Sequence, residues 1–223
     1  MRCAFVSRVS AAAACAAAFA ALAGLVAAGE LNGIDQWAID HLMPGARPGT
    51  GKQTFAGAVI PFWHVHWHGV VHVVSEIVTV PASFTPATVL VAIACLRLDG
   101  RVVVAAAYVV GNLVEIVTKW ALTRPALTVS SFDNSYPSGH TIRAVLLTAC
   151  VCAAWPRLRE LALAWLVAAI AFIEIGGFHV PSDVAGGLLI AGGLLATTWG
   201  SWGFEPGSSR RPSTAWRPSA RVR

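Results

Sequence analysis

Residues 137–156 read PSGHTIRAVLLTACVCAAWP, a polar Pro-Ser-Gly-His turn followed at once by an apolar segment with the length of a helix. Ser138 and Gly139 stand where that helix would begin, so its first backbone N–H groups and the positive end of its dipole would face an anion. Arg143 follows His140 by three residues and would share its face of the helix. The stretch predicts a helix whose first turn binds an anion. In isolation, the same Ser-Gly pair would merely cap a helix, and Arg143 would merely reach the membrane surface.

The composition indicates that this helix belongs to an integral membrane protein. Hydrophobic residues make up 56% of the 223 residues and charged residues only 12%, which is too apolar for a soluble domain and too uncharged for a disordered chain. A helix of about 20 apolar residues crosses the hydrocarbon core of a bilayer, which is about 30 Å thick. We therefore expect an all-α bundle of six transmembrane helices, at residues 9–28, 77–97, 101–121, 140–156, 160–177 and 183–203.

The positions of the basic residues predict the orientation of the bundle, because Lys and Arg in short loops stay on the cytoplasmic side. Arg97 and Arg101 flank the second loop, Arg157 and Arg159 lie in the fourth, and more arginines occur at both ends of the chain. We expect both termini in the cytoplasm, with the loops of residues 119–140 and 179–183 on the extracytoplasmic face of the inner (plasma) membrane. From the net charge of +5 we infer no nucleic-acid partner.

The expected domain organisation is simple. Residues 1–203 would form one transmembrane domain, and the Pro/Ser/Arg-rich residues 204–223 would form a disordered cytoplasmic tail. The first apolar segment also has the basic start, the Ala-rich core and the small residues of a cleaved signal peptide. Either alternative leaves the following segment exported, so the predicted face of the site is the same.

A second polar group lies at the start of the last apolar segment. His179 and Asp183 are four residues apart, so on a helix the carboxylate would accept a hydrogen bond from one ring nitrogen. The other nitrogen would then be free to attack phosphorus. Glu115 stands four residues before Lys119 in the third span, and a pair between them would lower the cost of burying either charge.

Four of the seven histidines form a separate cluster before the second span. Neutral imidazoles at this spacing could bind zinc or copper, form a protonation-sensitive lid over a lipid entrance, or simply pack at the membrane interface. The interleaved Trp63 and Trp67 favour interfacial packing. We therefore assign no metal or other cofactor. The cluster consists of His64, His66, His68 and His72.

The chain resembles the type 2 phosphatidic acid phosphatase (PAP2) superfamily, whose membrane branch has six helices and the motifs Lys-x6-Arg-Pro, Pro-Ser-Gly-His and Ser-Arg-x5-His-x3-Asp. The resemblance covers about residues 76–200. It implies that His179 is the nucleophile and forms a phosphohistidine, that Asp183 orients it, and that His140 protonates the leaving oxygen. It also implies that no metal takes part. The phosphate oxygens would be held by Lys119, Ser138 and Gly139.

The first and third motifs depart from the family pattern. Seven residues after Lys119, where the family has an arginine, this chain has Ala126, and Arg124 comes two residues early. Ile173 stands where the third motif has its arginine. Loss of a cation beside developing phosphoryl charge costs several kcal/mol of transition-state stabilisation, so we expect Arg124 and Arg143 to supply the missing charge.

The resemblance implies a metal-independent membrane phosphatase for a lipid phosphate or pyrophosphate of the isoprenoid pyrophosphate, phosphatidic acid or phosphatidylglycerol phosphate class. Two alternatives stay open. Fewer cations would suit a phosphodiester, as in a lipid phosphotransferase similar to the sphingomyelin-synthase branch, and they would also suit a lipid-binding protein that has lost turnover. A vanadium haloperoxidase is not expected, because that branch of the superfamily is soluble.

Overall fold

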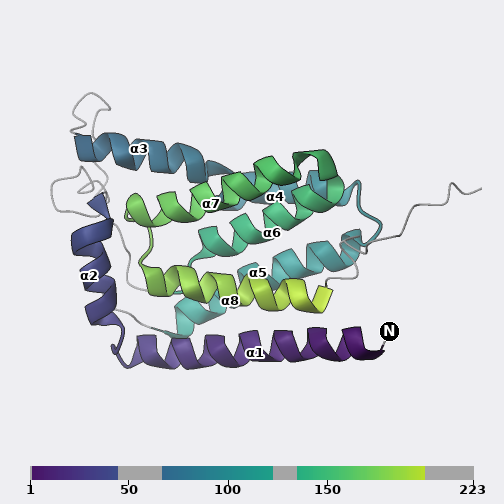
Figure 1. Ribbon diagram of the computed structural model, residues 1–223, viewed down its shortest axis with the longest axis horizontal. Coiled ribbons are helices and arrows are strands. Elements are labelled where there is room, and N and C mark those ends of the chain that lie inside the picture. Colours follow the sequence, from purple (N-terminus) through teal and green to yellow (C-terminus); the bar gives the residue numbers. More distant parts are fainter. Residues whose placement is uncertain (1, 45–66, 123–134, 199–223) are drawn as a thin grey trace, which may run out of the picture.

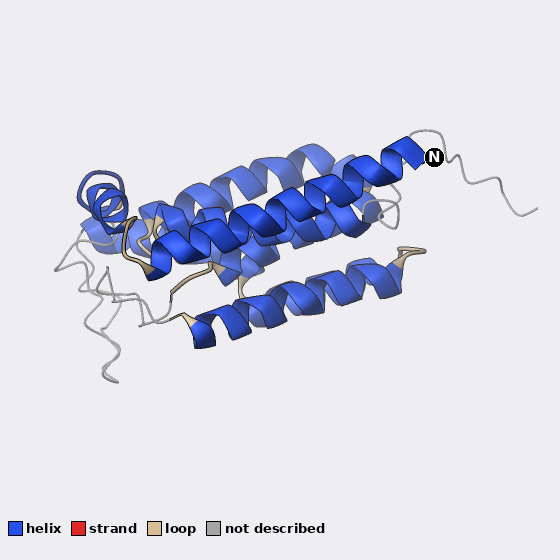
Figure 2. Cartoon of the chain, turned by 90° about the horizontal axis from the view of Figure 1, so that it is seen from below, coloured by secondary structure: helices blue, strands red, loops and turns tan. Residues whose placement is uncertain are grey.

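The computed structural model describes residues 2–44, 67–122 and 135–198, and within these ranges every regular element is a helix (Figures 1 and 2). The expected all-α fold is confirmed. Two short 3₁₀ helices, η4 and η5, cover Val80–Ala82 and Pro156–Leu158. The α-helices are α1 (Arg2–Ala27), α2 (Asn32–Leu42), α3 (Trp67–Thr79), α4 (Phe84–Cys95), α5 (Arg101–Ala121), α6 (Gly139–Ala154), α7 (Arg159–Ile175) and α8 (Pro181–Thr198).

Each of the six expected spans overlaps a helix or a helix pair of the structure, and residues 199–203 of the last one lie outside the described ranges. By length and apolar composition, three segments within the described ranges could cross a membrane, namely Val6–Ala27, Val73–Cys95 and Arg101–Ala121. The apolar helix α6 is shorter. These helices support a membrane protein, whereas the number of six spans stays a prediction.

The second expected span, residues 77–97, overlaps the candidate span Val73–Cys95 but is not one continuous α-helix. The chain is helical from Trp67, tightens into η4, and passes through Ser83 in an extended conformation (φ −66°, ψ 154°) before α4 begins. Pro81 explains the interruption, because its ring clashes with the preceding turn and its nitrogen carries no hydrogen. The interruption leaves the carbonyl of Ala82 free to bond outside its own helix, and Arg143 Nε donates to it at 2.9 Å.

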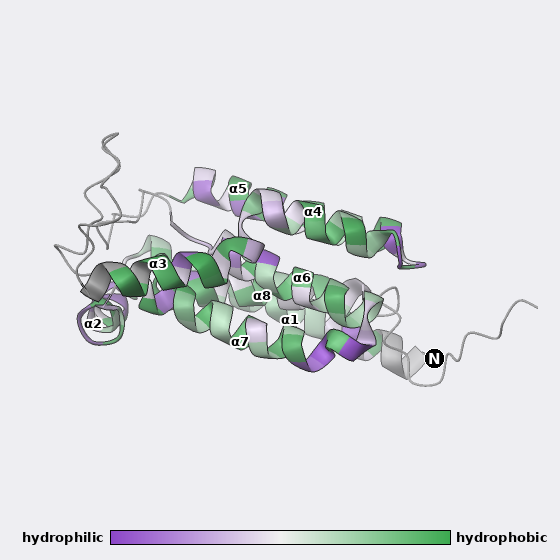
Figure 3. Ribbon diagram, turned by 90° about the horizontal axis from the view of Figure 1, so that it is seen from above, coloured by the Kyte–Doolittle hydropathy of each residue, from purple (hydrophilic) through white to green (hydrophobic). Residues whose placement is uncertain are grey.

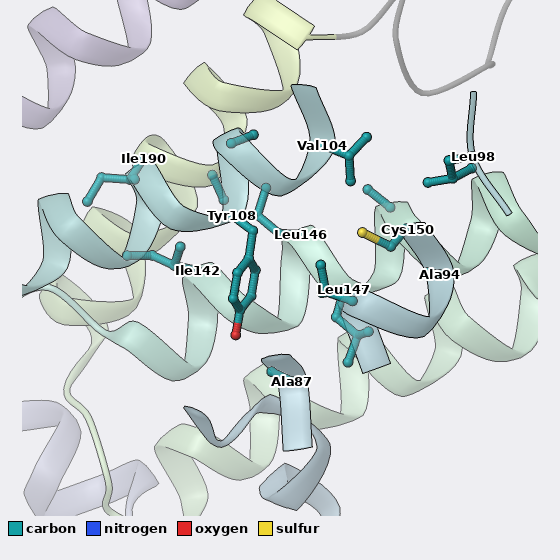
Figure 4. Close-up of a cluster of buried hydrophobic side chains, with 14 residues drawn as sticks. Ala87, Ala94, Leu98, Val104, Tyr108, Ile142, Leu146, Leu147, Cys150 and Ile190 are labelled. Carbon is teal, nitrogen blue, oxygen red and sulfur yellow. The ribbon is translucent and has the colours of Figure 1, made fainter. Parts of the chain in front are cut away.

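Helix α6 lies at the centre of the bundle and packs against α4, α5, α7 and α8. Figure 4 shows the core where these helices meet, with Ile142 and Leu146 of α6 near Tyr108 of α5. Helix α1 packs mainly along α8. The helix that carries His140 is therefore held on several sides.

The outward faces of the helices are apolar. Figure 3 shows hydrophobic residues along much of α4 and α7, and the exposed fractions of Val102, Val117 and Val167 reach 75%, 63% and 70%. Exposed apolar surface of this extent is unusual for a protein surrounded by water and is expected where helices contact lipid chains.

The two ends of the bundle differ in character. The α4–α5 and α6–α7 loops lie at the same end as the amino terminus (Figure 1), and there the guanidinium carbon of Arg97 is 5.2 Å from the centre of the Trp155 ring. The starts of α6 and α8 lie at the opposite end, which α2 crosses. The grouping of the basic loops at one end agrees with the charge pattern, and their cytoplasmic location stays a prediction.

Candidate active site

The anion-binding turn predicted at residues 138–140 forms the start of α6. Ser138 is the N-cap, and its Oγ accepts hydrogen bonds from the backbone N–H of Thr141 at 3.3 Å and from the Thr141 hydroxyl at 3.0 Å. Among the described residues, no group accepts a hydrogen bond from the N–H of Gly139 or of His140. Two donors at the positive end of the helix are therefore available for an anion.

This turn is held against the first turns of α8. The N–H of Ser138 donates to the carbonyl of Asp183 at 2.9 Å. A Cβ atom at Gly187 would lie 2.7 Å from the Ser138 carbonyl oxygen and 2.8 Å from Thr141 Cβ, so only glycine permits this approach. The two motifs, far apart in sequence, thus meet through backbone contact.

The predicted pair of His179 and Asp183 is present. Its Nδ1 to Oδ2 distance is 3.3 Å, and the side chains are 10% and 1% exposed. Since a carboxylate only accepts, Nδ1 carries the hydrogen in the neutral ring. The pair therefore fixes the tautomer and leaves Nε2 of His179 as the basic nitrogen.

The two histidines face each other at this end of the bundle. Their ring centroids are 6.0 Å apart, with the ring planes inclined at 55°. The His140 ring also stacks on the Phe178 ring, with the ring centroids 6.4 Å apart and the ring planes inclined at 18°. The rings come from α6 and from the α7–α8 loop, so their separation depends on the tertiary structure.

A carboxylate and two cations lie beside this pair. The predicted contact between Glu115 and Lys119 is present, at 2.7 Å between Oε1 and Nζ. Arg143 also reaches Glu115, at 2.7 Å between Nη1 and Oε2, and it bonds Asn112 Oδ1 at 3.1 Å. Arg143 is 6% exposed, so it does not extend to the membrane surface. Its hydrogen bonds go to α5 and to η4.

The Glu115 carboxylate also touches the start of α6. A Cβ atom on Gly139 would overlap its carboxyl carbon and both oxygens. The sequence predicted only one contact of Glu115, the pair with Lys119 on the same helix. The contacts with Gly139 and Arg143 arise because α5 packs against α6, and no spacing along the chain indicates this approach.

Asp35 is a site residue that sequence reasoning missed. It is 1% exposed and accepts hydrogen bonds from the Ser182 hydroxyl at 2.6 Å and from the Ser182 N–H at 3.2 Å. Its helix, α2, was not expected, and packs through Ile39 and Met43 against Val180. One signal was available, since Val180 precedes Pro181 at the start of α8 and has no side-chain oxygen to cap the helix.

Some predicted residues lie outside the described ranges. Arg124 falls in residues 123–134, and His64 and His66 fall in residues 45–66. The backbones of His68 and His72 belong to α3, without described side chains. In the ranges that the structure describes, no group of three or more His, Cys, Asp or Glu is placed to hold a metal ion.

The fold and this geometry define a class, a helical membrane protein whose paired histidines adjoin an anion-binding helix start. A comparison with known protein families shows which family the chain is similar to. The model of the PAP2 superfamily matches residues 116–205, so this part of the chain is similar to that superfamily, in agreement with the resemblance of the motifs. The match supports a phosphatase-type function on lipid phosphates in general terms. No curated protein and no solved structure matches the chain.

Proposed function

We propose that the protein is a membrane phosphatase that hydrolyses a lipid phosphate or pyrophosphate through a phosphohistidine at His179. The observation that carries the proposal is the 6.0 Å separation of the His140 and His179 rings, with Asp183 bonded to Nδ1 of His179. A phosphorus atom about 3–3.5 Å from the His179 ring and a leaving oxygen about 3 Å from His140 fit this spacing.

In the first step, Nε2 of His179 attacks phosphorus, and the bond from phosphorus to the lipid oxygen breaks. His140 in its protonated form donates its proton to that oxygen, so the lipid leaves as an alcohol, or as a monophosphate when the substrate is a pyrophosphate. The Asp183 carboxylate stabilises the positive charge that develops on the His179 ring. In the second step, neutral His140 takes a proton from water, which attacks phosphorus, releases inorganic phosphate and frees His179.

The phosphoryl oxygens would be held by the start of α6 and by nearby cations. The N–H groups of Gly139 and His140 supply two donors, and the Ser138 hydroxyl lies beside them. Lys119 is 31% exposed, so its ammonium group can reach a ligand at this end. Arg124 is proposed as a further cation.

The proposed location follows the charge pattern of the loops. Basic loops at the opposite end of the bundle would face the cytoplasm with both termini, so the site would open on the extracytoplasmic surface of the inner membrane. A lipid phosphate in that leaflet reaches the site with its chain still among the helices. Isoprenoid pyrophosphates, phosphatidic acid and phosphatidylglycerol phosphate meet this requirement.

The test is a phosphate-release assay on the purified full chain in detergent, with these three lipid classes as substrates. We expect release with at least one class, a radiolabelled phosphoenzyme, and loss of both in His179→Ala. His140→Ala should reduce turnover strongly. His41→Ala is the matched control, because His41 is an exposed histidine whose ring bonds the Trp37 carbonyl on α2. Lipid binding without release from any substrate would refute the proposed hydrolysis and favour a binding protein.

One observation favours a second candidate, a lipid phosphotransferase acting on phosphodiester headgroups. Arg143 and Lys119 both pair with Glu115, which leaves one uncompensated positive charge in this group of three side chains. A phosphodiester carries a single negative charge and needs fewer cations than a phosphomonoester. Exchange of headgroups between two lipids, without release of inorganic phosphate, would establish this alternative.

A further inference from the structure

Glu115 is the one acidic side chain in the described ranges that touches the start of α6 and both nearby cations. Its two oxygens lie 2.7 Å from Lys119 Nζ and 2.7 Å from Arg143 Nη1. The carboxyl group also fills the space where a Cβ of Gly139 would be. A carboxylate thus occupies part of the environment in which an anionic ligand would bind.

The position of the Glu115 carboxylate matters because other charged groups lie near His140. Glu115 contacts both Lys119 and Arg143, and the ring of His179 lies 6.0 Å from that of His140. The two cations and the carboxylates of Glu115 and Asp183 cancel when both histidines are neutral. Glu115 and Arg143 are buried, and an uncompensated charge has a larger effect in such surroundings than in water.

We infer that Glu115 is a resident counter-anion that sets the charge of the phosphoryl group this site accepts, disfavouring multiply charged phosphates relative to singly charged ones. The inference rests on the proposed function, in which Lys119 and the start of α6 hold the phosphoryl group. The Coulomb repulsion from Glu115 grows with the charge of the ligand, so a pyrophosphate is penalised more than a monophosphate. A neutral substitute for Glu115 removes this repulsion and frees both cations.

A purely structural role for Glu115 predicts a different result. In that case Glu115 would only neutralise the buried Arg143, and its removal would lower stability without improving anion binding. Anion affinity therefore distinguishes the two roles. Catalytic turnover is not needed for the measurement.

The experiment measures binding of inorganic phosphate and inorganic pyrophosphate to the full chain in detergent by isothermal titration calorimetry at fixed low ionic strength. We expect Glu115→Gln to bind phosphate about tenfold more tightly than the unsubstituted protein and pyrophosphate about a hundredfold more tightly. Glu174→Gln is the matched control and should change neither affinity, because Glu174 is a partly buried carboxylate on α7, whereas Lys119 and Arg143 pair with Glu115. Equal or weaker binding by Glu115→Gln would overturn the inference.

A second comparison covers the case in which Glu115→Gln does not fold because Arg143 loses its carboxylate. Arg143→Gln and the double variant Glu115→Gln/Arg143→Gln differ only at residue 115 and contain no buried guanidinium at this site. The double variant should again bind pyrophosphate at least tenfold more tightly than Arg143→Gln, and equal affinities would refute the inference. Absence of lipid hydrolysis by the unsubstituted protein would refute the proposed phosphatase without changing this comparison.

Discussion

Asp35 provides the sharpest prediction about how the site is held in place. Replacement by alanine removes the acceptor of two hydrogen bonds, one from the Ser182 hydroxyl and one from the Ser182 N–H. Ser182 is itself only 7% exposed, so both donors would lose the Asp35 carboxylate inside the protein. The substitution therefore removes a charged acceptor from two donors of a nearly buried serine.

The expected magnitude follows from these two bonds. A hydrogen bond to a charged group contributes about 1.5–3 kcal/mol, and the shorter bond, at 2.6 Å, has the geometry of a strong one. Allowing for partial relaxation, we expect Asp35→Ala to lose about 3 kcal/mol of unfolding free energy. For a chain of this size that loss lowers the melting temperature by about 6–12 °C. Because Ser182 adjoins Asp183, we also expect kcat to fall about tenfold to a hundredfold.

The assay combines thermal unfolding in detergent with steady-state phosphate release. Asp35→Asn should lose about half as much stability, since its amide oxygen can still accept one bond. Asp40→Ala is the matched control on the same helix, where the exposed carboxylate accepts from Gln36 at 3.0 Å, and it should change stability by about 0.5 kcal/mol or less. If Asp35→Ala melts within about 2 °C of the unsubstituted protein with its kcat intact, the contact does not position the start of α8.

Three further predictions concern other residues. Asp183→Asn should slow phosphoenzyme formation roughly a thousandfold in single-turnover measurements while leaving phosphate affinity intact, because the amide no longer fixes the His179 tautomer. Gly139→Ala should destabilise the protein by about 1–3 kcal/mol, since its Cβ would overlap the Glu115 carboxylate. Gly192→Ala, whose Cβ would be 3.8 Å from Cys15 Sγ, should be tolerated, and equal melting temperatures for the two variants would contradict the close contact at Gly139. Thr148→Val should raise stability by about 1 kcal/mol, because Thr148 Oγ1 is buried without a hydrogen-bond partner among the described residues, and a lower melting temperature would argue against that reading.

Local patterns in the sequence predicted the parts of the site that depend on one helix. Ser138 caps α6 and Glu115 pairs with Lys119, at spacings of three and four residues, whereas His179 pairs with Asp183 from the loop just before α8. A helix fixes such neighbours by its own geometry, whatever the rest of the protein does. For the same reason, the helical class and the positions of most helices followed from apolar segments and turns.

Contacts between helices could not be predicted from these patterns. The pairing of Glu115 with Arg143 joins α5 to α6, and the bond from Ser182 to Asp35 joins residues 147 positions apart. Both contacts depend on how closely the helices approach each other. Small residues such as Gly139 and Gly187 permit a close approach, but the sequence does not show which element packs against them. The interruption at Pro81 was a missed local signal, because a proline within an apolar segment breaks the regular helix before it.

The first turn of α8 connects the parts of this site. The Asp183 side chain bonds His179, and its carbonyl accepts from the N–H of Ser138. The neighbouring Ser182 bonds Asp35 from α2. A displacement of this turn would therefore shift the partner of the proposed nucleophile and the anion-binding turn together. That coupling would give α2 a role in the proposed chemistry although its described residues contribute no group to the contact between the histidines: by anchoring Ser182, α2 holds the start of α8, which contacts both His179 and the start of α6.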